Sequence, residues 1–588
     1  MKNRTWDLTH LYKTNEEFEN DLKMVKKYLE NVIKFKGKLD KFDIILDYFK
    51  LDTELSIVLD RLAVYAFCKK DDNGRDFQNV KNYERINNLY SRIGEDLAFA
   101  KVELSKLDEE FLREMKKDER FADFDRTIED IIRYKKHTLS EKQEQLMSRV
   151  SSFSSTDDIF SVLSNLEMNH GSFVDEKGKE VKLSPQNYNL MMNNPDHIVR
   201  RRVMEAYYGE YGRLIQTYAG LLTSHIKYEN FLAKEYGFES VLDMKCFAEE
   251  VDKNVMLNNI KNVSKRTELL HQYFDVKRKI LGLEEFYTSD IGTQIYTGEE
   301  KLADYDEVVE DISQSFKVLG DDYVKKFDEA VKNGWIDAFP RKDKTSGGYT
   351  ISAYGVHPYI LLNFDGTREW ASALAHEFGH AMHSYYSAEK QAYPKSNYTL
   401  FVAEIVSLLN EILYNKYLIS KTTDKKEKMK LLAEFLQLFE LNVFDSTMLA
   451  EFELFIHDEN QKGETLTAED YTNKFKELAQ SYFGKGVKLC KNYEYGWSRK
   501  SHIYRDYYLY KYSLGLCCAC SLSEDILNDK TGEALRKYRR FLELGGAMDP
   551  VSALRVAGLD VLSDDIYEKA FNMFENYLKN LENLLNNN

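Results

Sequence analysis

The sequence predicts a mainly α-helical protein in which two helical lobes enclose a deep cleft, with a small β-sheet beside a histidine-bearing helix. Only six prolines occur in 588 residues, so long helices can form without interruption. Apolar residues recur three and four positions apart through most of the chain, as on the buried face of a helix. Short glycine-bounded runs between residues 335 and 365 break this pattern and predict the strands.

The composition is that of an ordinary globular protein, with 43% hydrophobic and 31% charged residues. The net charge of −16 argues against a nucleic-acid partner, because such a protein needs a basic face for the phosphates. No uncharged apolar run approaches the ~18 residues of a membrane span, so no membrane partner is expected. A chain of this length can bury a large core in two or more lobes.

The first residues, Met1 to Asp7, lack the apolar core of a secretory signal, which predicts a cytoplasmic protein. Six cysteines, three of them at Cys517, Cys518 and Cys520, fit the reduced thiols of that compartment. A Cys-Cys-x-Cys metal cluster is the alternative for these three. The small residues around them are typical of a buried helix, which favours packing. The sequence does not indicate an oligomeric state.

Residues 1–115 are predicted to form an N-terminal helical domain, followed by a helical connecting region over residues 116–200. Within the connecting region, residues 172–183 have the pattern of a small hairpin. The remaining residues, 201–588, form the third predicted domain. The first helix of the chain shows apolar residues at helical spacing: Phe18, Leu22, Val25, Leu29 and Ile33.

Three short runs are predicted as strands: Ile336-Asp337, Gly347 to Ile351 and Tyr359 to Asn363. They end just before the histidine-bearing helix, so we expect a small sheet whose edge lies along the cleft. An edge strand offers unpaired N–H and C=O groups, which can hold an extended peptide by its backbone. A purely structural sheet accounts for the same pattern.

The segment Ala375-His376-Glu377-Phe378-Gly379-His380 has the pattern His-Glu-x-x-His inside an apolar helical stretch. Residues four apart lie on one face of a helix, so His376 and His380 can present two imidazole nitrogens to one metal ion, with Glu377 beside them. The pattern is expected to arise by chance in roughly 2% of sequences of this length and composition. An unpaired histidine pair would also be costly in a buried helix. The motif therefore predicts a zincin-type helix, with Glu377 as the candidate general base.

A catalytic zinc ion needs a third protein ligand and an open position for water. Glu404 lies in the apolar helical run from Leu400 to Glu411, and buried carboxylates are rarely left unpaired, so we expect it to be that ligand. His383 continues the stripe of His376 and His380, but two helical turns span about 10.5 Å whereas zinc–nitrogen bonds are about 2 Å. We therefore expect His383 to line the cleft or to support the ligands, with a structural role as the alternative.

The stretch from His502 to Tyr512 contains five tyrosines beside a histidine. So many hydroxyl groups are too polar for a dry core unless each one finds a partner. This composition favours a wall of the cleft.

Three segments closely resemble the thimet-oligopeptidase-like zinc peptidases: Gly379-His380-Ala381-Met382-His383, Phe401-Val402-Ala403-Glu404 and Pro358-Tyr359-Ile360-Leu361-Leu362-Asn363. The resemblance extends over nearly the whole chain, from Trp6-Asp7-Leu8 to Ala557-Gly558-Leu559-Asp560. It implies a zinc-dependent endopeptidase that hydrolyses short, unstructured oligopeptides, with one zinc ion per chain. It also implies that residues 201–588 form the catalytic domain.

The resemblance implies roles for two further groups of residues. In the related enzymes the sheet holds the substrate, which makes Tyr359, Ile360 and Leu361 candidates for substrate binding. Tyr504 and His383 are the further candidates for that role. A histidine and tyrosines near the C-terminus stabilise the oxyanion in those enzymes, and the matching stretch here offers the residues His502, Tyr507 and Tyr510. The spacing differs from that of the thimet branch, so Tyr504 is a further candidate in the same stretch.

Two other functions stay open at this point. A metallocarboxypeptidase of similar cleft architecture would need a basic group dedicated to the substrate carboxylate, and no such group stands out in the sequence. A peptide-binding scaffold without catalysis is the second alternative. Binding alone does not need a general base, so the intact Glu377 argues against a scaffold.

Overall fold

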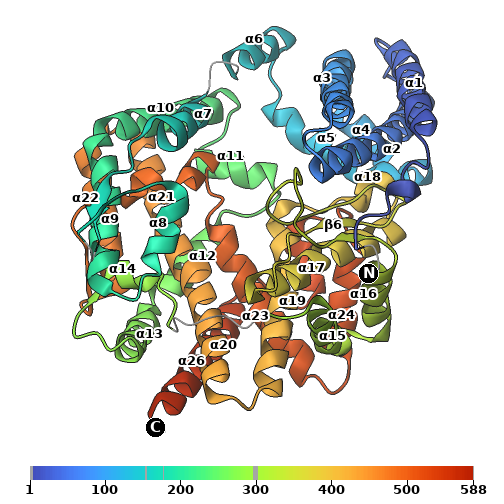
Figure 1. Cartoon of the computed structure of the whole chain (residues 1–588). Coiled ribbons are helices and arrows are strands. Elements are labelled where there is room, and N and C mark those ends of the chain that lie inside the picture. The colour runs from blue at the N-terminus through green and yellow to red at the C-terminus, as the bar shows by residue number, and fades with distance from the viewer. Residues whose placement is uncertain (1–3, 152–154, 176–177, 296–301, 587–588) are drawn as a thin grey trace. The chain divides into compact units, whose positions relative to one another are not determined.

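A computed structural model gives the structure of residues 4–151, 155–175, 178–295 and 302–586 (Figure 1). The chain is 73% helical, and the strands of its described residues form only small sheets. These features confirm the predicted mainly α class. None of the described helices is long and apolar enough to cross a membrane.

The chain forms two compact units, each assembled from three segments. Unit 1 comprises Met1–Glu141, Glu300–Tyr417 and Leu522–Leu559. Unit 2 comprises Lys142–Glu299, Leu418–Ser521 and Asp560–Asn588. A division into three consecutive domains, with boundaries near residues 115 and 200, stays a prediction.

The N-terminal segment of unit 1 consists mainly of helices, in which α1 packs on α2 and α2 on α3. The first turn of α1 is capped by Thr14, whose side chain accepts the N–H of Glu17. The buried apolar side chains of this segment form one core with Ala353, which follows a strand of the sheet in the same unit, and with Tyr359, which lies in that sheet. The helices are α1 (Asn15–Val32), α2 (Phe42–Asp72), α3 (Phe77–Ser105), α4 (Glu109–Lys117) and α5 (Asp125–Tyr134).

The three predicted runs are confirmed as strands of one sheet in unit 1: β4 (Ile336–Asp337), β5 (Tyr349–Ile351) and β6 (Tyr359–Leu361). Their spatial order is β4-β6-β5, with β6 parallel to β4 and antiparallel to β5. Because β6 is central, its backbone is paired on both sides. Its three side chains are also buried.

The β4 side of the sheet is covered by the N-terminal segment. The amide of Ala338 donates to the carbonyl of Arg4, and the amide of Asp7 donates to the carbonyl of Gly334. No further backbone segment in the described part of the chain pairs with β5. The open edge of the sheet is therefore β5.

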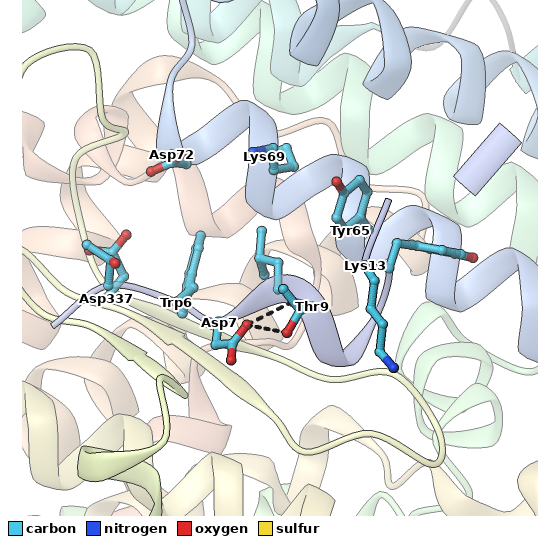
Figure 2. Close-up of a pocket in the computed structure, with 11 residues that line it drawn as sticks. Trp6, Asp7, Thr9, Lys13, Tyr65, Lys69, Asp72 and Asp337 are labelled. Carbon is cyan, nitrogen blue, oxygen red and sulfur yellow. Dashed lines mark hydrogen bonds between the residues drawn. The ribbon is translucent and has the colours of Figure 1, made fainter. Parts of the chain in front are cut away.

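The same N-terminal segment forms one wall of a pocket of about 340 Å³, which Figure 2 shows with Trp6, Asp7 and Thr9. The hydroxyl of Thr9 donates to the Asp7 carboxylate at 2.6 Å, which stabilises the turn. The indole N–H of Trp6 donates to the carbonyl of Ile360 at 2.8 Å and ties this segment to the central strand. The pocket is lined by Thr5, Trp6, Asp7, Leu8, Thr9, Tyr12, Lys13, Tyr65, Lys69, Asp72 and Asp337.

The other helices of unit 1 come before or after the three strands in the chain, and α17 carries the histidines. Phe378 on α17 packs against the rings of Phe316, Tyr323 and Phe327, which explains why this face of α17 is apolar. These helices are α15 (Tyr305–Ser315), α16 (Asp321–Lys332), α17 (Arg368–Lys390), α18 (Tyr393–Ser396), α19 (Leu400–Lys421), α24 (Glu533–Leu542) and α25 (Pro550–Val556).

Unit 2 is also helical, and it contains the predicted hairpin. Strands β1 (Ser172–Val174) and β2 (Glu180–Lys182) pair in antiparallel register, which confirms that prediction. Strands β3 (Phe286–Tyr287) and β7 (Val487–Lys488) form a short parallel pair. The helices are α6 (Glu141–Ser151), α7 (Thr156–Val162), α8 (Pro185–Met192), α9 (His197–Arg213), α10 (Ile215–Glu235), α11 (Val241–Ala248), α12 (Asn254–Ser264), α13 (Thr267–Ile280), α14 (Thr288–Ile291), α20 (Lys425–Phe439), α21 (Ser446–Gln461), α22 (Ala468–Phe483) and α26 (Asp565–Asn586).

The helix α23 (Tyr510–Asn528) begins in unit 2 and ends in unit 1. Its cysteines Cys517, Cys518 and Cys520 form no disulfide and are fully buried. Burial raises the pKa of Cys518 well above its usual range, so this thiol stays protonated. These observations agree with the predicted packing role.

Candidate metal centre

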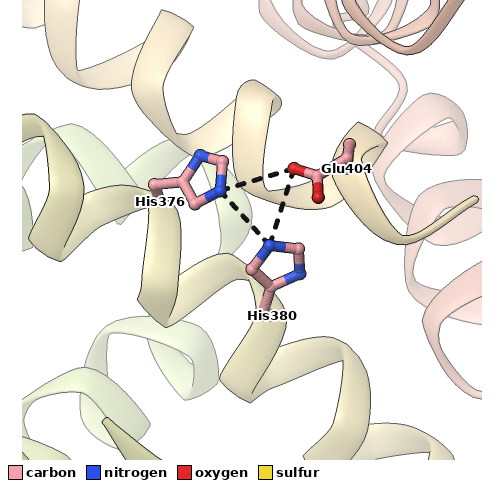
Figure 3. Close-up of side chains that lie close together, drawn as sticks. All are labelled: His376, His380 and Glu404. Atoms are coloured by element: carbon pink, nitrogen blue, oxygen red, sulfur yellow. Dashed lines mark hydrogen bonds and ion pairs between the residues drawn. The ribbon is translucent and has the colours of Figure 1, made fainter. Parts of the chain in front are cut away.

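The histidine pair and Glu404 converge on one point in unit 1, as Figure 3 shows. His376 and His380 lie four residues apart on α17, and Glu404 comes from the first turns of α19. The opposite side of α17 is buried through Leu374 and Phe378. The apolar face fixes the rotation of α17 about its axis and thereby aims both imidazoles at α19.

The three donor atoms form a small triangle. Nε2 of His376 lies 3.2 Å from Nε2 of His380 and 3.4 Å from Oε2 of Glu404, and Nε2 of His380 lies 3.7 Å from the same oxygen. Ligands about 2.0–2.1 Å from a tetrahedral zinc ion are separated from one another by roughly 3.3–3.4 Å. The triangle therefore has the size of one face of such a tetrahedron.

The electrostatics of the group favour a cation. Burial alone would lower the pKa of His376, but hydrogen bonds with Glu404 and Glu411 outweigh it and raise this pKa to about 10. Burial would likewise raise the pKa of Glu404, but His376 and His380 hold it well below its usual range. The carboxylates thus attract positive charge, whether a proton or a metal ion. Two imidazoles with one carboxylate suit zinc and other transition metals better than calcium or magnesium.

A residue that sequence analysis missed orients the first histidine. Oε1 of Glu411 lies 2.5 Å from Nδ1 of His376, and the hydroxyl of Ser372 donates to Oε2 of Glu411 at 3.0 Å. This carboxylate accepts the Nδ1 proton and leaves Nε2 free for a metal. The sequence feature that could have identified Glu411 is its spacing from Glu404: the two lie seven residues apart and so share a face of α19.

Gly379, inside the motif, permits the close packing of α17 on α19. A Cβ atom at this position would lie 2.6 Å from Cα of Ser407 and 2.9 Å from the carbonyl oxygen of Val406. Backbone atoms cannot move away as a flexible side chain can. The glycine is therefore required for the approach that brings Glu404 to the histidines.

Glu377 follows directly after a candidate ligand and is partly buried. Oε2 of its carboxyl group lies 2.8 Å from the hydroxyl of Thr350 on β5. The predicted base thus has a fixed neighbour from the open edge of the sheet.

The structure corrects the expectation that His383 lines a cleft. Its side chain is 1% exposed and stacks on the ring of Tyr398 at 3.6 Å between centroids. Burial, with the nearby charge of His380, lowers the pKa of His383 to about 3, so the imidazole is neutral. It lies outside the group that can hold a metal, and its role is packing under the site.

The structure also corrects the substrate role predicted for Tyr359, Ile360 and Leu361. These residues form the central strand β6, so their backbone groups are paired on both sides and their side chains are buried. A strand in this position cannot pair with a peptide. The prediction failed because sequence alone does not reveal which of three short strands is central.

The candidates His502, Tyr504, Tyr507 and Tyr510 belong to unit 2. His502 and Tyr504 are partly exposed in a 3-10 helix, Ser501–Arg505. Tyr507 and Tyr510 are 2% and 1% exposed, so they are buried rather than forming an exposed wall. Their role toward the metal centre stays a prediction.

Unit 2 contains a second buried group that sequence analysis missed, formed by His225, Glu229 and Asp506. Nζ of Lys245 lies 2.8 Å from Oε2 of Glu229 and 3.0 Å from Oδ2 of Asp506. The ammonium group already supplies positive charge to both carboxylates, so this group does not need a metal. The four-residue spacing of His225 and Glu229 in a predicted helix was the only sequence signal.

A helical protein in which a His-Glu-x-x-His helix meets a glutamate on a second helix has the organisation of a zincin-type metallopeptidase. The family model of Peptidase family M3 matches residues 190–573, and that of Oligopeptidase F matches residues 103–169. The chain belongs to Peptidase family M3. It is a metalloendopeptidase that acts on oligopeptides, as the resemblance implied.

Individual relatives agree with this membership. Oligopeptidase PepF of Bacillus subtilis is 33% identical over 586 residues, with 99% of this chain and 87% of the relative covered. The crystal structure of oligoendopeptidase F from Enterococcus faecium has a TM-score of 0.74 and 26% identity, and the match covers 98% of this chain and 100% of the other. A crystal structure from Chlamydophila abortus reaches a TM-score of 0.94 at 28% identity, covering 99% and 98% of the two chains.

We predict that Gly379→Ala destabilises the protein, because the added methyl group meets the backbone of α19. Such overpacking costs about 1–3 kcal/mol. The measurement is the midpoint of thermal unfolding, with Gly220→Ala on α10 as the control, since a Cβ there meets nothing within 4 Å. We expect a lower midpoint for the first variant and an unchanged or higher one for the second. Equal midpoints for Gly379→Ala and wild type would contradict the packing argument.

We predict that Glu404→Ala abolishes metal binding, and that Glu411→Ala weakens it by the roughly 10–100-fold typical of residues that orient a ligand. Metal content after dialysis against a weak chelator, measured by elemental analysis, distinguishes the two. Glu389→Ala, an exposed position at the end of α17, is the control and should behave as wild type. Retention of metal by Glu404→Ala together with its loss in His383→Ala would show that the ligand set is wrong.

Proposed function

We propose that the protein is a zinc-dependent endopeptidase that hydrolyses short, unstructured oligopeptides in the cytoplasm. One zinc ion per chain would be held by His376, His380 and Glu404. The observation that carries this proposal is the triangle of donor atoms, 3.2, 3.4 and 3.7 Å apart, with Glu377 as the next residue after His376. Its size and its donor types fit tetrahedral zinc.

When bound, the zinc ion would lower the pKa of a water molecule and polarise the carbonyl group of the scissile peptide bond. Glu377 would accept a proton from that water on a carboxylate oxygen and deliver it to the nitrogen of the leaving amine. Glu411 would hold His376 with its Nδ1 proton facing away from the ligand position.

The substrate strand that we propose is β5, because it is the open edge of the sheet. A peptide paired with an edge strand is recognised through its backbone, so many sequences can bind. Such a peptide has to be extended, and a folded protein would have to unfold first at a cost of about 5–15 kcal/mol. This requirement supports a preference for unstructured oligopeptides.

We propose that hydroxyl groups stabilise the negative charge that develops on the carbonyl oxygen, as the resemblance to the family implies. Tyr507 and Tyr510 are the proposed donors, with His502 and Tyr504 as further candidates in the same stretch. Support comes from the match of this stretch to the family and from the chemistry, since a phenol can donate to an oxyanion.

The cytoplasmic location is supported by the thiols. The six cysteines of the chain all lie in the described residues, form no disulfide and are buried, which suits a reducing compartment.

Glu377→Gln is expected to keep the metal and the fold but to lose most turnover, because an amide of nearly the same shape cannot accept the proton. General base catalysis contributes typically ~10²–10⁴-fold. Initial rates on a quenched oligopeptide, with metal content measured on the same preparation, test this. Glu389→Gln is the matched control and should keep wild-type rates. Rates of Glu377→Gln within a few-fold of wild type would remove Glu377 from the mechanism.

Tyr507→Phe or Tyr510→Phe is expected to lower kcat by roughly 10²–10³-fold, as loss of one oxyanion donor does in other enzymes. KM should change little, because the hydroxyl acts mainly in the transition state. Tyr508→Phe, which removes a neighbouring hydroxyl, serves as the comparison. Full kcat in both variants would leave Tyr504 or His502 as the donor.

A further inference from the structure

The hydroxyl of Thr350 has an unusual pair of neighbours. Its oxygen lies 2.8 Å from Oε2 of Glu377 and also 2.8 Å from the main-chain carbonyl oxygen of Glu377. Both contacts join the middle residue of β5 to α17, and both are partly buried. A hydroxyl group has one proton to donate, whereas both neighbours are oxygen atoms.

The register of the sheet shows how Thr350 is oriented. Thr350 is opposite Ile360 on β6, and the amide of Ile360 donates to Trp335 on the β4 side at 2.8 Å. Thr350 and Ile360 are therefore a non-hydrogen-bonded pair, so the N–H and C=O of Thr350 point away from β6 to the open edge. The neighbouring Tyr349 points to the other face, where its hydroxyl donates to Asp71 at 3.0 Å.

This geometry restrains the carboxylate of Glu377. The hydroxyl of Thr350 can donate to Oε2, and its oxygen also lies against the main-chain carbonyl group of the same residue. Because Thr350 belongs to a paired strand, the contact limits rotation of the Glu377 side chain relative to α17.

We propose that Thr350 is a positioning residue for peptide hydrolysis, whose hydroxyl holds the Glu377 carboxylate in place. The same residue presents its N–H and C=O at the open edge of β5, so it connects the strand that would pair with substrate to the base that acts on it. This inference rests on the proposed role of Glu377.

Thr350→Val removes the hydroxyl and keeps the shape of the side chain, and Thr350→Ser restores the hydroxyl without the methyl group. A hydrogen bond to a charged group is lost in the first variant only, and we expect kcat to fall roughly 10–100-fold with KM within a factor of about two. Thr350→Ser should recover most of kcat. Metal content and the unfolding midpoint should match wild type in both variants, which separates positioning from folding and metal binding.

The matched control is Thr367→Val. This change also removes a threonine hydroxyl that donates to a carboxylate, here Asp365 at 2.7 Å, but the bond lies before the start of α17 and away from Glu377. We expect kcat within a factor of about two of wild type. An equal loss of kcat in Thr350→Val and Thr367→Val would overturn the proposal, because the loss would not depend on Glu377.

The double variant Glu377→Gln with Thr350→Val tests whether Thr350 acts through Glu377. We expect no further loss beyond Glu377→Gln alone, since residues that act as one unit are not additive. A further loss as large as that in the wild-type background would overturn the proposal. Wild-type kcat in Thr350→Val beside an inactive Glu377→Gln would overturn the role of Thr350 and keep the proposed function. Wild-type rates in Glu377→Gln itself would overturn both.

Discussion

The close packing of α17 against α19 at Gly379 is the contact on which the site depends. Because no Cβ separates Gly379 from the backbone of Ser407, the two helices approach within backbone contact. Glu404 lies almost one turn before Ser407 and Glu411 about one turn after it. They therefore approach opposite nitrogens of His376, with Glu404 at Nε2 and Glu411 at Nδ1. One packing contact thus sets both the third candidate ligand and the orientation of the first.

The sheet in unit 1 is supported from two directions. Its β4 side is closed by backbone hydrogen bonds to Arg4 and Asp7, and β5 is attached to α2 through Tyr349 and Asp71. These contacts leave one open edge, and Thr350 on that edge contacts α17. The N-terminal segment and α2 therefore help to hold the proposed substrate strand, β5, next to the helix that bears the histidines.

Buried charged groups stabilise the backbone around Asp506 and Tyr507 in unit 2. Asp506 and Tyr507 have φ angles of 33° and 57°, in the left-handed region that non-glycine residues rarely adopt. The carboxylate of Asp506 bonds His225 and Lys245, and the amide of Tyr507 donates to Glu453 at 3.1 Å. These contacts stabilise the backbone of this segment in that conformation.

The sequence by itself determined the features that depend on short spacing. Helical periodicity predicted the fold class, glycine-bounded runs predicted the strands, and the spacing of His376 and His380 predicted a shared face. Glu404 was predicted to be the third metal ligand because it lies in an apolar helical run, where a buried charge needs a partner. These inferences work because the geometry of a helix or strand relates neighbours in the chain directly.

Tertiary structure alone decided which partners meet across the chain. Contacts between residues 27 or 35 positions apart, such as Thr350 with Glu377 and His376 with Glu411, depend on how separate elements pack. The same holds for the order of the three strands, which left β5 rather than β6 at the open edge. It also holds for His383, because its place in the stripe of histidines did not reveal that Tyr398 would cover it. Periodicity fixes the face on which a side chain lies, whereas burial and partners depend on the elements that pack against that face.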